Sequence, residues 1–355
     1  MVRNTGDLSI QNYCARSMLP HIASLRKTAQ NALRRKNSED IHDLRVASRR
    51  IRTCLSLFLN YLPSKKSKPW VREIKAITQS YSRVRDLDVQ IDLLNILYKN
   101  TLEKSLLAGI RRVRLRLRQK RAKQESETRT LTAAILESPT LLEMQAWSES
   151  VISAPNSGEE RTITLFQSAY TQIQSRLDEF LFYEVFIFDP ERINELHQMR
   201  IAAKHLRYAL EIFSDLYDRK TDFALEISRK TQQVLGEIHD ADVWSMYLPR
   251  FLNREQARVN HFYGFNSPFN RLKPGVEFLL ENRKTERGRL YIQFLEDWKK
   301  WKMKETWLNL RKIIFLTSLA LQNINLPKPA DQNNETKNLV YKQSSNAIHK
   351  DDKET

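Results

Sequence analysis

Cationic side chains that recur at helical spacing are the groups in this sequence best suited to chemistry. Within residues 41–58, an arc of about 80° along roughly 15 Å of an α-helix would hold His42, Arg45, Arg49 and Arg52. Guanidinium groups present forked N–H donors that match anionic oxygens, and lysine ammonium groups add point charges. The spacing therefore predicts a helix face that binds an anion, which we call the first basic stripe.

The pattern occurs a second time in residues 196–213, where each matched residue lies 155 positions after its counterpart. The matched pairs are His42 and His197, Arg45 and Arg200, Arg49 and Lys204, Arg52 and Arg207, Leu55 and Leu210, and Phe58 and Phe213. Segments 84–89 (VRDLDV) and 238–243 (IHDADV) keep nearly the same separation. We infer an internal duplication, whose second basic stripe is His197, Arg200, Lys204 and Arg207.

Each stripe needs a helix that also packs, and the sequence provides a packing face. On the helical wheel of the first copy, an apolar face lies roughly 130° from the cations and consists of Leu44, Ala47, Ile51, Leu55 and Phe58. One helix can thus be buried on one side and cationic on the other.

Length and composition indicate an all-α globular protein. The chain has 355 residues, 41% of them hydrophobic, with only 7 Gly and 11 Pro placed between long periodic segments. We expect a single duplicated helical domain over 1–322, with a first half 1–152, a linker 153–160 and a second half 161–322. A disordered polar tail is expected over 323–355.

The expected helices follow from apolar periodicity, caps and breakers. They cover residues 8–35 with a kink at Pro20, 39–61, 68–82, 86–100, 104–126, 140–152, 161–188, 190–217, 221–235, 240–260 and 276–323. Asp86 is expected to act as an N-cap or ion-pair partner, and Asp189 with Pro190 to open the second stripe helix.

The charge balance indicates a polyanionic partner. Lys and Arg number 59 against 42 Asp and Glu, a formal charge of +17, and such an excess typically marks nucleic acid, an anionic membrane or a phosphate polymer as partner. The start lacks a signal-peptide core, no apolar run could cross a membrane, and Cys14 and Cys54 have no metal or redox spacing. We expect reduced thiols in a cytoplasmic protein that does not associate with membranes.

The duplicated segments resemble the two halves of a CHAD domain, the family named for histidine-bearing α-helical domains. The resemblance rests on HDLRVASRRIR at 42–52 and HQMRIAAKHLRYALE at 197–211, each followed by a D-x-D-V segment, and spans residues 8–321. It implies two four-helix bundles related by a pseudo-two-fold axis, with a basic channel that binds inorganic polyphosphate. His205 stands where the family more often has Lys or Arg, and Ser82 stands where the other half has Gly236.

Sequence thus predicts a polyphosphate-binding protein without catalytic residues, cofactor or metal site. The resemblance places binding on His42, Arg45, Arg49, Arg50, Arg52, His197, Arg200, Lys204 and Arg207, and we add Lys75, Arg229 and Arg118 to the expected site. Association with polyphosphate granules and binding of other polyanions are further expectations. Neither an alternating-glutamate ExExK motif nor a GxxxxGK[ST] loop occurs.

Three alternatives remain open. The stripes could be helix faces that are merely solvated. The basic run at 111–123 could equally be a solvated face. The protein could bind nucleic acid, although no helix-turn-helix, zinc or RNA-recognition signature occurs and only Tyr208 interleaves with the stripes. It could also be an unrecognised polyphosphate-processing enzyme. The aspartates of the D-x-D-V segments are expected to be structural, and the tryptophans of 298–307 to be core or partner-facing.

Overall fold

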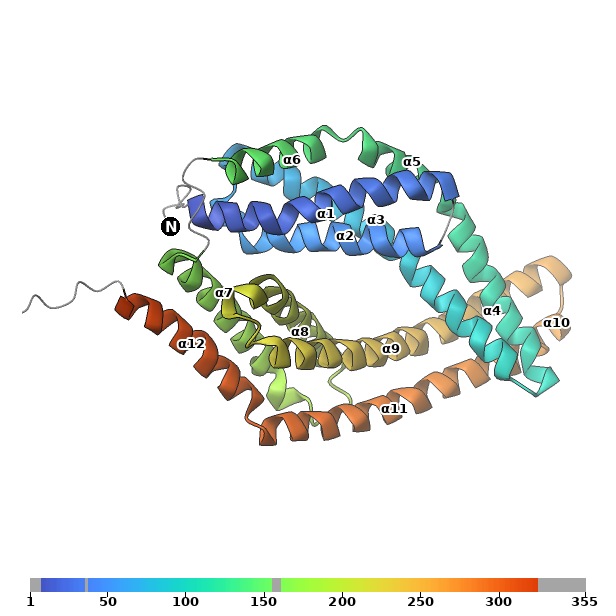
Figure 1. Cartoon of the computed structure of the whole chain (residues 1–355). Coiled ribbons are helices and arrows are strands. Elements are labelled where there is room, and N and C mark those ends of the chain that lie inside the picture. The colour runs from blue at the N-terminus through green and yellow to red at the C-terminus, as the bar shows by residue number, and fades with distance from the viewer. Residues whose placement is uncertain (1–7, 36–37, 155–160, 325–355) are drawn as a thin grey trace, which may run out of the picture.

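The protein is all-α, as the sequence predicts. The computed structural model describes residues 8–35, 38–154 and 161–324, and every regular element in these ranges is helical (Figure 1). The expected tail from 325 and most of the expected linker, 155–160, lie outside the described residues.

The first part of the chain forms six α-helices that pack mainly among themselves, with a short 3-10 helix after the second. They are α1 (Leu8–Arg35), α2 (Ser38–Leu57), η1 (Leu59–Tyr61), α3 (Ser64–Asn100), α4 (Lys104–Lys123), α5 (Glu125–Leu136) and α6 (Pro139–Ile152). Helix α1 contacts α2, α5 and α6, and α2 also contacts α3. The Ser138 hydroxyl caps α6 by accepting a hydrogen bond from the Leu141 amide at 3.1 Å.

Within residues 161–324, the second part of the chain consists of six further α-helices and two short 3-10 helices. Its elements are α7 (Ile163–Phe182), η2 (Tyr183–Phe186), α8 (Ile193–Phe213), η3 (Ser214–Tyr217), α9 (Asp222–Tyr263), α10 (Ser267–Asn270), α11 (Lys273–Met303) and α12 (Thr306–Ile324). Helix α8 packs between α7 and α9, and α12 lies along α7. The two parts meet where α1 contacts α7, α2 contacts α8 and α4 contacts α11 (Figure 1).

Several expected boundaries are wrong. The helices expected at 68–82 and 86–100 are one helix, α3, and those at 221–235 and 240–260 are one helix, α9. Asp86 therefore lies inside a helix and is not an N-cap. Neither D-x-D-V segment contains Pro, and Gly236 is tolerated at a cost of only about 1 kcal/mol, so nothing interrupts the backbone hydrogen bonds.

The starts and ends of the later helices also differ from expectation. Helix α8 begins at Ile193 rather than at 190, with Arg192 as N-cap, while the Asp189 carboxylate accepts from the Glu191 amide at 2.9 Å. The expected helix 276–323 is divided between α11 and α12 at Glu305, whose φ is 50°. A left-handed residue ends a helix because its carbonyl turns away from the axis.

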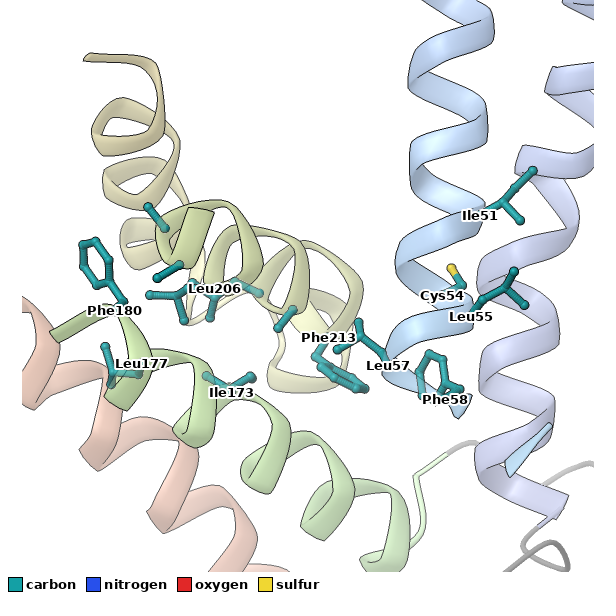
Figure 2. Packing of buried hydrophobic residues seen from close by; sticks show 14 of the residues in the cluster. Ile51, Cys54, Leu55, Leu57, Phe58, Ile173, Leu177, Phe180, Leu206 and Phe213 are labelled. Carbon is teal, nitrogen blue, oxygen red and sulfur yellow. The ribbon is translucent and has the colours of Figure 1, made fainter. Parts of the chain in front are cut away.

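Apolar residues of both stripe helices share one core. Phe58 and Phe213, which correspond in the two copies, contact each other edge-on with ring centroids 5.7 Å apart. Tyr13 of α1 stacks on Phe213 at 5.9 Å. Figure 2 shows the two phenylalanines between the ends of α2 and α8, with Ile51 and Leu55 turned toward α1. The ends of the two stripe helices are therefore fixed against each other.

A second, smaller core holds an arm formed by α4 with the C-terminal part of α3, the C-terminal part of α9 and the N-terminal part of α11. Its buried residues are Leu87, Leu94, Ile110, Val113, Leu117, Trp244, Leu248, Phe251, Val276 and Leu279. Gly109 of α4 and Gly275 of α11 allow the backbones to touch, because a Cβ built on Gly109 would lie 2.7 Å from the Gly275 Cα.

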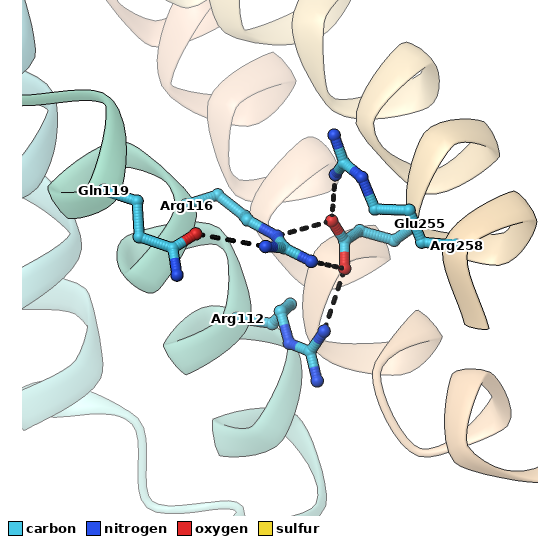
Figure 3. A network of polar contacts seen from close by, with 5 residues as sticks. All are labelled: Arg112, Arg116, Gln119, Glu255 and Arg258. Carbon is cyan, nitrogen blue, oxygen red and sulfur yellow. Dashed lines mark hydrogen bonds and ion pairs between the residues drawn. The ribbon is translucent and has the colours of Figure 1, made fainter. Parts of the chain in front are cut away.

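One buried carboxylate ties α4 to α9 in this arm (Figure 3). Glu255 is 1% exposed, and it accepts from Arg112 at 3.0 Å and from Arg116 at 2.8 Å, as well as from Arg258 of its own helix. Burial alone raises the pKa of Glu255, but the hydrogen bonds from Arg116 and Arg258 outweigh burial and bring that pKa below its usual value.

Candidate functional site

A cavity of about 490 Å³ lies between the two parts of the chain, and we call it the shared cavity. Five helices contribute to its lining: α2, α3, α7, α8 and α9. The lining residues are Arg45, Arg49, Arg52, Thr53, Ser56, Leu57, Thr78, Ser82, Ser175, Arg176, Glu179, Arg200, Lys204, His205, Tyr208 and Gln232. Both basic stripes therefore face the same space.

Five of the predicted cations line this cavity, and none of them lies within ion-pair distance of a described carboxylate. Glu179 is the only carboxylate among the lining residues, and it lies 3.6 Å from His205 Nδ1. The five are Arg45, Arg49, Arg52, Arg200 and Lys204, none of which forms an ion pair with a described carboxylate. Unpaired cations around a concave space attract a polyanion strongly.

The pKa of Lys204 reflects how close the two basic stripes lie to each other. Burial, followed by the charges of Arg200, Arg52, Arg49 and Arg45, lowers the pKa of Lys204 to about 8. Three of these four guanidinium groups belong to α2, in the other copy of the repeat. The ammonium group of Lys204 is thus held in a field that an incoming anion would relieve.

Several buried polar atoms at the cavity have no hydrogen-bond partner among the described residues. They are Nε of Arg49, Nε of Arg200, the Tyr208 hydroxyl and Oε1 of Gln232. The Arg49 guanidinium lies over the Tyr208 ring at 5.3 Å, which orients it by cation–π attraction. Buried donors without partners are costly in a folded protein unless a ligand or water satisfies them.

Arg50 and Arg207 do not line the shared cavity. Arg50 forms an ion pair of 3.0 Å with Glu211, so α2 and α8 are joined beside the cavity. Arg207 also lies over the Tyr208 ring, 4.6 Å from its centroid. These two residues flank the site and support the groups that line it.

The residues added from outside the stripes are dispersed. Lys75 lines a separate hollow on α3, Arg229 pairs with Glu226 on α9, and Arg118 of the arm bonds to Asn95 Oδ1 at 3.4 Å. None of them lines the shared cavity. The other arginines of the basic run 111–123 donate hydrogen bonds to Asn95, Tyr98, Asp88 and Glu255.

The two predicted histidines differ in their surroundings. His197 Nδ1 lies 3.1 Å from Nδ1 of His239, so one nitrogen donates and the other accepts. Burial, then His197 and Arg200, lower the pKa of His239 to about 4, while burial with Arg200 and Lys204 lowers that of His197. His42 is half-buried on α2, and neither His42 nor His197 lines the cavity.

Sequence reasoning missed Arg176 of α7, which lines the cavity beside His205. A signal exists in the duplication, because Arg176 lies 155 residues after His21, just as His205 lies 155 after Arg50. The pKa of His21 is lowered by burial and by Arg50, and that of His205 by burial and then by Lys204, with Arg176 contributing. One copy pairs His21 with Arg50, and the other pairs Arg176 with His205, so the Arg and the His have changed places. Arg176 therefore supplies the positive charge that His205 lacks.

The aspartates of the two D-x-D-V segments lie near the stripes. Burial raises the pKa of Asp86, and the charges of Arg45 and Arg200 partly offset that rise. Burial also raises the pKa of Asp240; Arg200 lowers it, and the charge of Asp86 raises it further. Asp242 is paired with Arg287. Carboxylates that face arginines in this way orient cations.

The chain is similar to known proteins in sequence and in fold. A family model described as CHAD domain matches residues 16–249. The chain belongs to the CHAD domain family. The CHAD domain of the plant Ricinus communis is 21% identical, covers 79% of this chain and 87% of its own, and has a TM-score of 0.55. PptA from Streptomyces chartreusis is 14% identical, covers 81% of this chain and 99% of its own, and has a TM-score of 0.50. No curated protein matches the sequence.

The described ranges contain neither a metal-binding cluster nor a membrane-spanning helix. No three His, Cys, Asp or Glu side chains gather there as a metal-binding set. No helix in those ranges has the length and apolar character needed to span a membrane.

Proposed function

We propose that this CHAD domain protein binds inorganic polyphosphate in the shared cavity and does not cleave it. The observation that carries the proposal is that Arg45, Arg49 and Arg52 of one copy face Arg200 and Lys204 of the other across a single space. Arginines would bind successive phosphates through forked hydrogen bonds, and Lys204 would add a point charge. Family membership supports a phosphate polymer as the ligand.

The proposal includes the symmetric architecture implied by the family resemblance. Two four-helix bundles related by a pseudo-two-fold axis would place α2 and α8 on either side of that axis. The contact between the corresponding residues Phe58 and Phe213 supports this arrangement. A linear polyanion with equivalent units fits such a site, because each copy can present the same cations to it.

Binding without hydrolysis is the second part of the proposal. Glu179 is engaged with His205, and Asp86 lies at the cavity's edge near Arg45 and Arg200. Phosphoryl transfer ordinarily relies on metal ions held by carboxylates and on a positioned nucleophile. A non-catalytic role would suit a cytoplasmic protein that associates with polyphosphate granules.

Nucleic-acid binding is the competing hypothesis, since it uses the same positive charge. The tryptophans at 298, 301 and 307 are 3%, 8% and 8% exposed. They therefore pack in the core, which is one of the two positions expected from the sequence. Single-stranded nucleic acid is usually held by exposed aromatic rings that stack on bases. Tyr208, at 9% exposure, presents little ring surface for stacking.

A competition titration tests the proposal. Long-chain polyphosphate should bind the full chain, and duplex DNA at equal phosphate concentration should fail to displace it. Arg49→Ala should weaken binding about ten-fold through the loss of one charge-assisted contact, whereas Lys299→Ala, at an exposed position of α11, should change it little. Displacement by DNA would refute the ligand, and shortening of the polymer by the protein with divalent metal would refute the absence of catalysis.

A further inference from the structure

The shared cavity adjoins two further hollows on α3. A hollow of about 480 Å³ shares Arg52, Thr78 and Ser82 with the cavity and adds Gln79, Arg83 and Asp86. A further hollow of about 560 Å³ shares Gln79 with that one. Its lining residues are Leu59, Lys68, Val71, Arg72, Lys75, Ala76 and Gln79. Together the two hollows form a surface path along α3.

Cations follow this path at helical spacing. Lys68, Arg72, Lys75 and Arg83 are separated by four, three and eight residues, which keeps them on one face of α3 along about 22 Å. Lys68, Arg72 and Lys75 are exposed and form no ion pair with a described carboxylate. Arg83 donates a hydrogen bond to Ser80 at 3.2 Å and lies 3.9 Å from the Glu127 carboxylate.

The corresponding positions in the other copy are mostly acidic. At the separation of 154 residues that relates Asp86 to Asp240, Lys68 is replaced by Asp222, Arg72 by Glu226 and Arg83 by Glu237. Lys75 corresponds to Arg229, which is paired with Glu226. The stripes at the cavity are alike in the two copies, but the flanks that lead away from it differ.

We infer that a long polyphosphate chain leaves the shared cavity in one direction only, over the face of α3, where Lys68, Arg72 and Lys75 form a second binding track. The inference rests on the proposed function and specifies the length of its ligand. A short oligophosphate would be held by the cavity alone. A longer chain would gain contacts on α3. The matching positions of α9 carry Asp222 and Glu226, which are paired with Arg219 and Arg229, and offer no unpaired cation to the chain.

Asp86 is the one carboxylate along this path. Burial raises its pKa, and Arg45 and Arg200 oppose that rise. Asp86 therefore faces cations of both stripes at the junction between cavity and track, and Arg52 and Arg83 line the same hollow. The path consequently stays positive from the cavity to Lys68.

The test compares two triple variants of the full chain. The track variant is Lys68→Gln, Arg72→Gln and Lys75→Gln. The matched control removes the same charge from exposed positions on α11 and α12, as Lys284→Gln, Lys299→Gln and Lys312→Gln. Binding of tripolyphosphate and of long-chain polyphosphate is measured at several salt concentrations, and circular dichroism checks that both variants fold.

The track variant should bind long chains about ten-fold more weakly than the parent and tripolyphosphate with unchanged affinity. Its salt dependence for long chains should be shallower by about two in log–log slope, because each lost contact removes about 0.7 to 0.9. The control should change neither value comparably. The track would be overturned, with cavity binding left intact, if the two variants had equal affinities and salt dependence. The same would follow if the track variant lost equal affinity for long chains and for tripolyphosphate. A parent that binds neither ligand would overturn the proposed function itself.

Discussion

Lys204 is the residue whose chemistry responds most directly to a ligand in the cavity. Its pKa is about 8, below the usual value of about 10.4, because burial and four arginines disfavour the ammonium form. A bound polyanion favours that form and raises the pKa again. Binding must therefore be accompanied by proton uptake at Lys204 whenever the free protein has lost that proton.

This predicts a pH dependence with a definite sign. Affinity for tripolyphosphate should fall as pH rises from about 7 to about 9, since a growing fraction of Lys204 must be protonated on binding. Lys204→Arg should flatten the decline, because guanidinium stays charged throughout. Titrations at constant ionic strength measure the effect, and an equally steep decline in Lys204→Arg would exclude Lys204 as its source.

The His197 and His239 pair predicts a second proton linkage at lower pH. Both pKa values are depressed, that of His239 to about 4, so the pair is neutral in the free protein near pH 7. A polyanion beside Arg200 and Lys204 should raise both values, and binding should take up protons at about pH 5 to 6. Calorimetry in buffers of different ionisation enthalpy measures this uptake. His239→Gln should reduce it, and uptake unchanged by that substitution would assign the linkage elsewhere.

At the scale of elements, the crossing of α4 and α11 depends on two glycines. Gly109→Ala would place a methyl group 2.7 Å from the Gly275 Cα and the Val276 amide nitrogen, and should lower the free energy of unfolding by about 1–3 kcal/mol. Gly288→Ala is the matched control, because Gly288 lies in α11 with nothing within 4 Å of a Cβ. It should raise stability by about 0.5–1 kcal/mol. Urea denaturation measures both, and similar values for the two variants would contradict the close crossing.

The Glu255 cluster predicts how firmly the arm is held. Glu255→Gln leaves Arg112, Arg116 and Arg258 without a carboxylate and should cost about 2–3 kcal/mol, since these arginines keep part of their hydration. Glu277→Gln, which removes an exposed partner of Lys273 at 3.7 Å, should change stability by less than about 0.5 kcal/mol. The folded-state pKa of Glu255 is depressed, so its stabilisation should be lost only as pH falls below about 4. A Glu255→Gln variant as stable as the control would show that the cluster is not needed.

Sequence patterns predict the stripe helices well and the lengths of α3 and α9 badly. A stripe helix combines cations on one face with apolar residues on another at the same helical period. The repetition of this pattern in the second copy makes chance less plausible. The D-x-D-V segments offer cap-forming residues that favour a helix start, but long-range packing of α9 against α8 and α11 keeps the helix continuous. Arg176 carries no local signal, because a single arginine on the amphipathic α7 resembles any solvated residue.

For the whole molecule, the question is whether the duplication produces two binding sites or one. Arg45, Arg49, Arg200 and Lys204 line a single cavity, so one ligand should contact both copies. Removing either stripe, by Arg45→Ala with Arg49→Ala or by Arg200→Ala with Lys204→Ala, should then weaken affinity about a hundred-fold or more. Two charge-assisted contacts of about 1.5–3 kcal/mol each are lost in either case. The mass of polymer bound at saturation should stay the same.

Independent surface patches would behave differently. Neutralising one patch would remove about half of the binding stoichiometry and leave the affinity of the other patch intact. Because both stripes act on one ligand in the shared cavity, the variant with all four substitutions should show little binding at physiological salt, and the two double variants should resemble each other. Titration to saturation with tripolyphosphate separates the cases, since this ligand is short enough to report on the cavity alone. Halved stoichiometry at unchanged affinity would refute a single site even if polyphosphate remained the ligand.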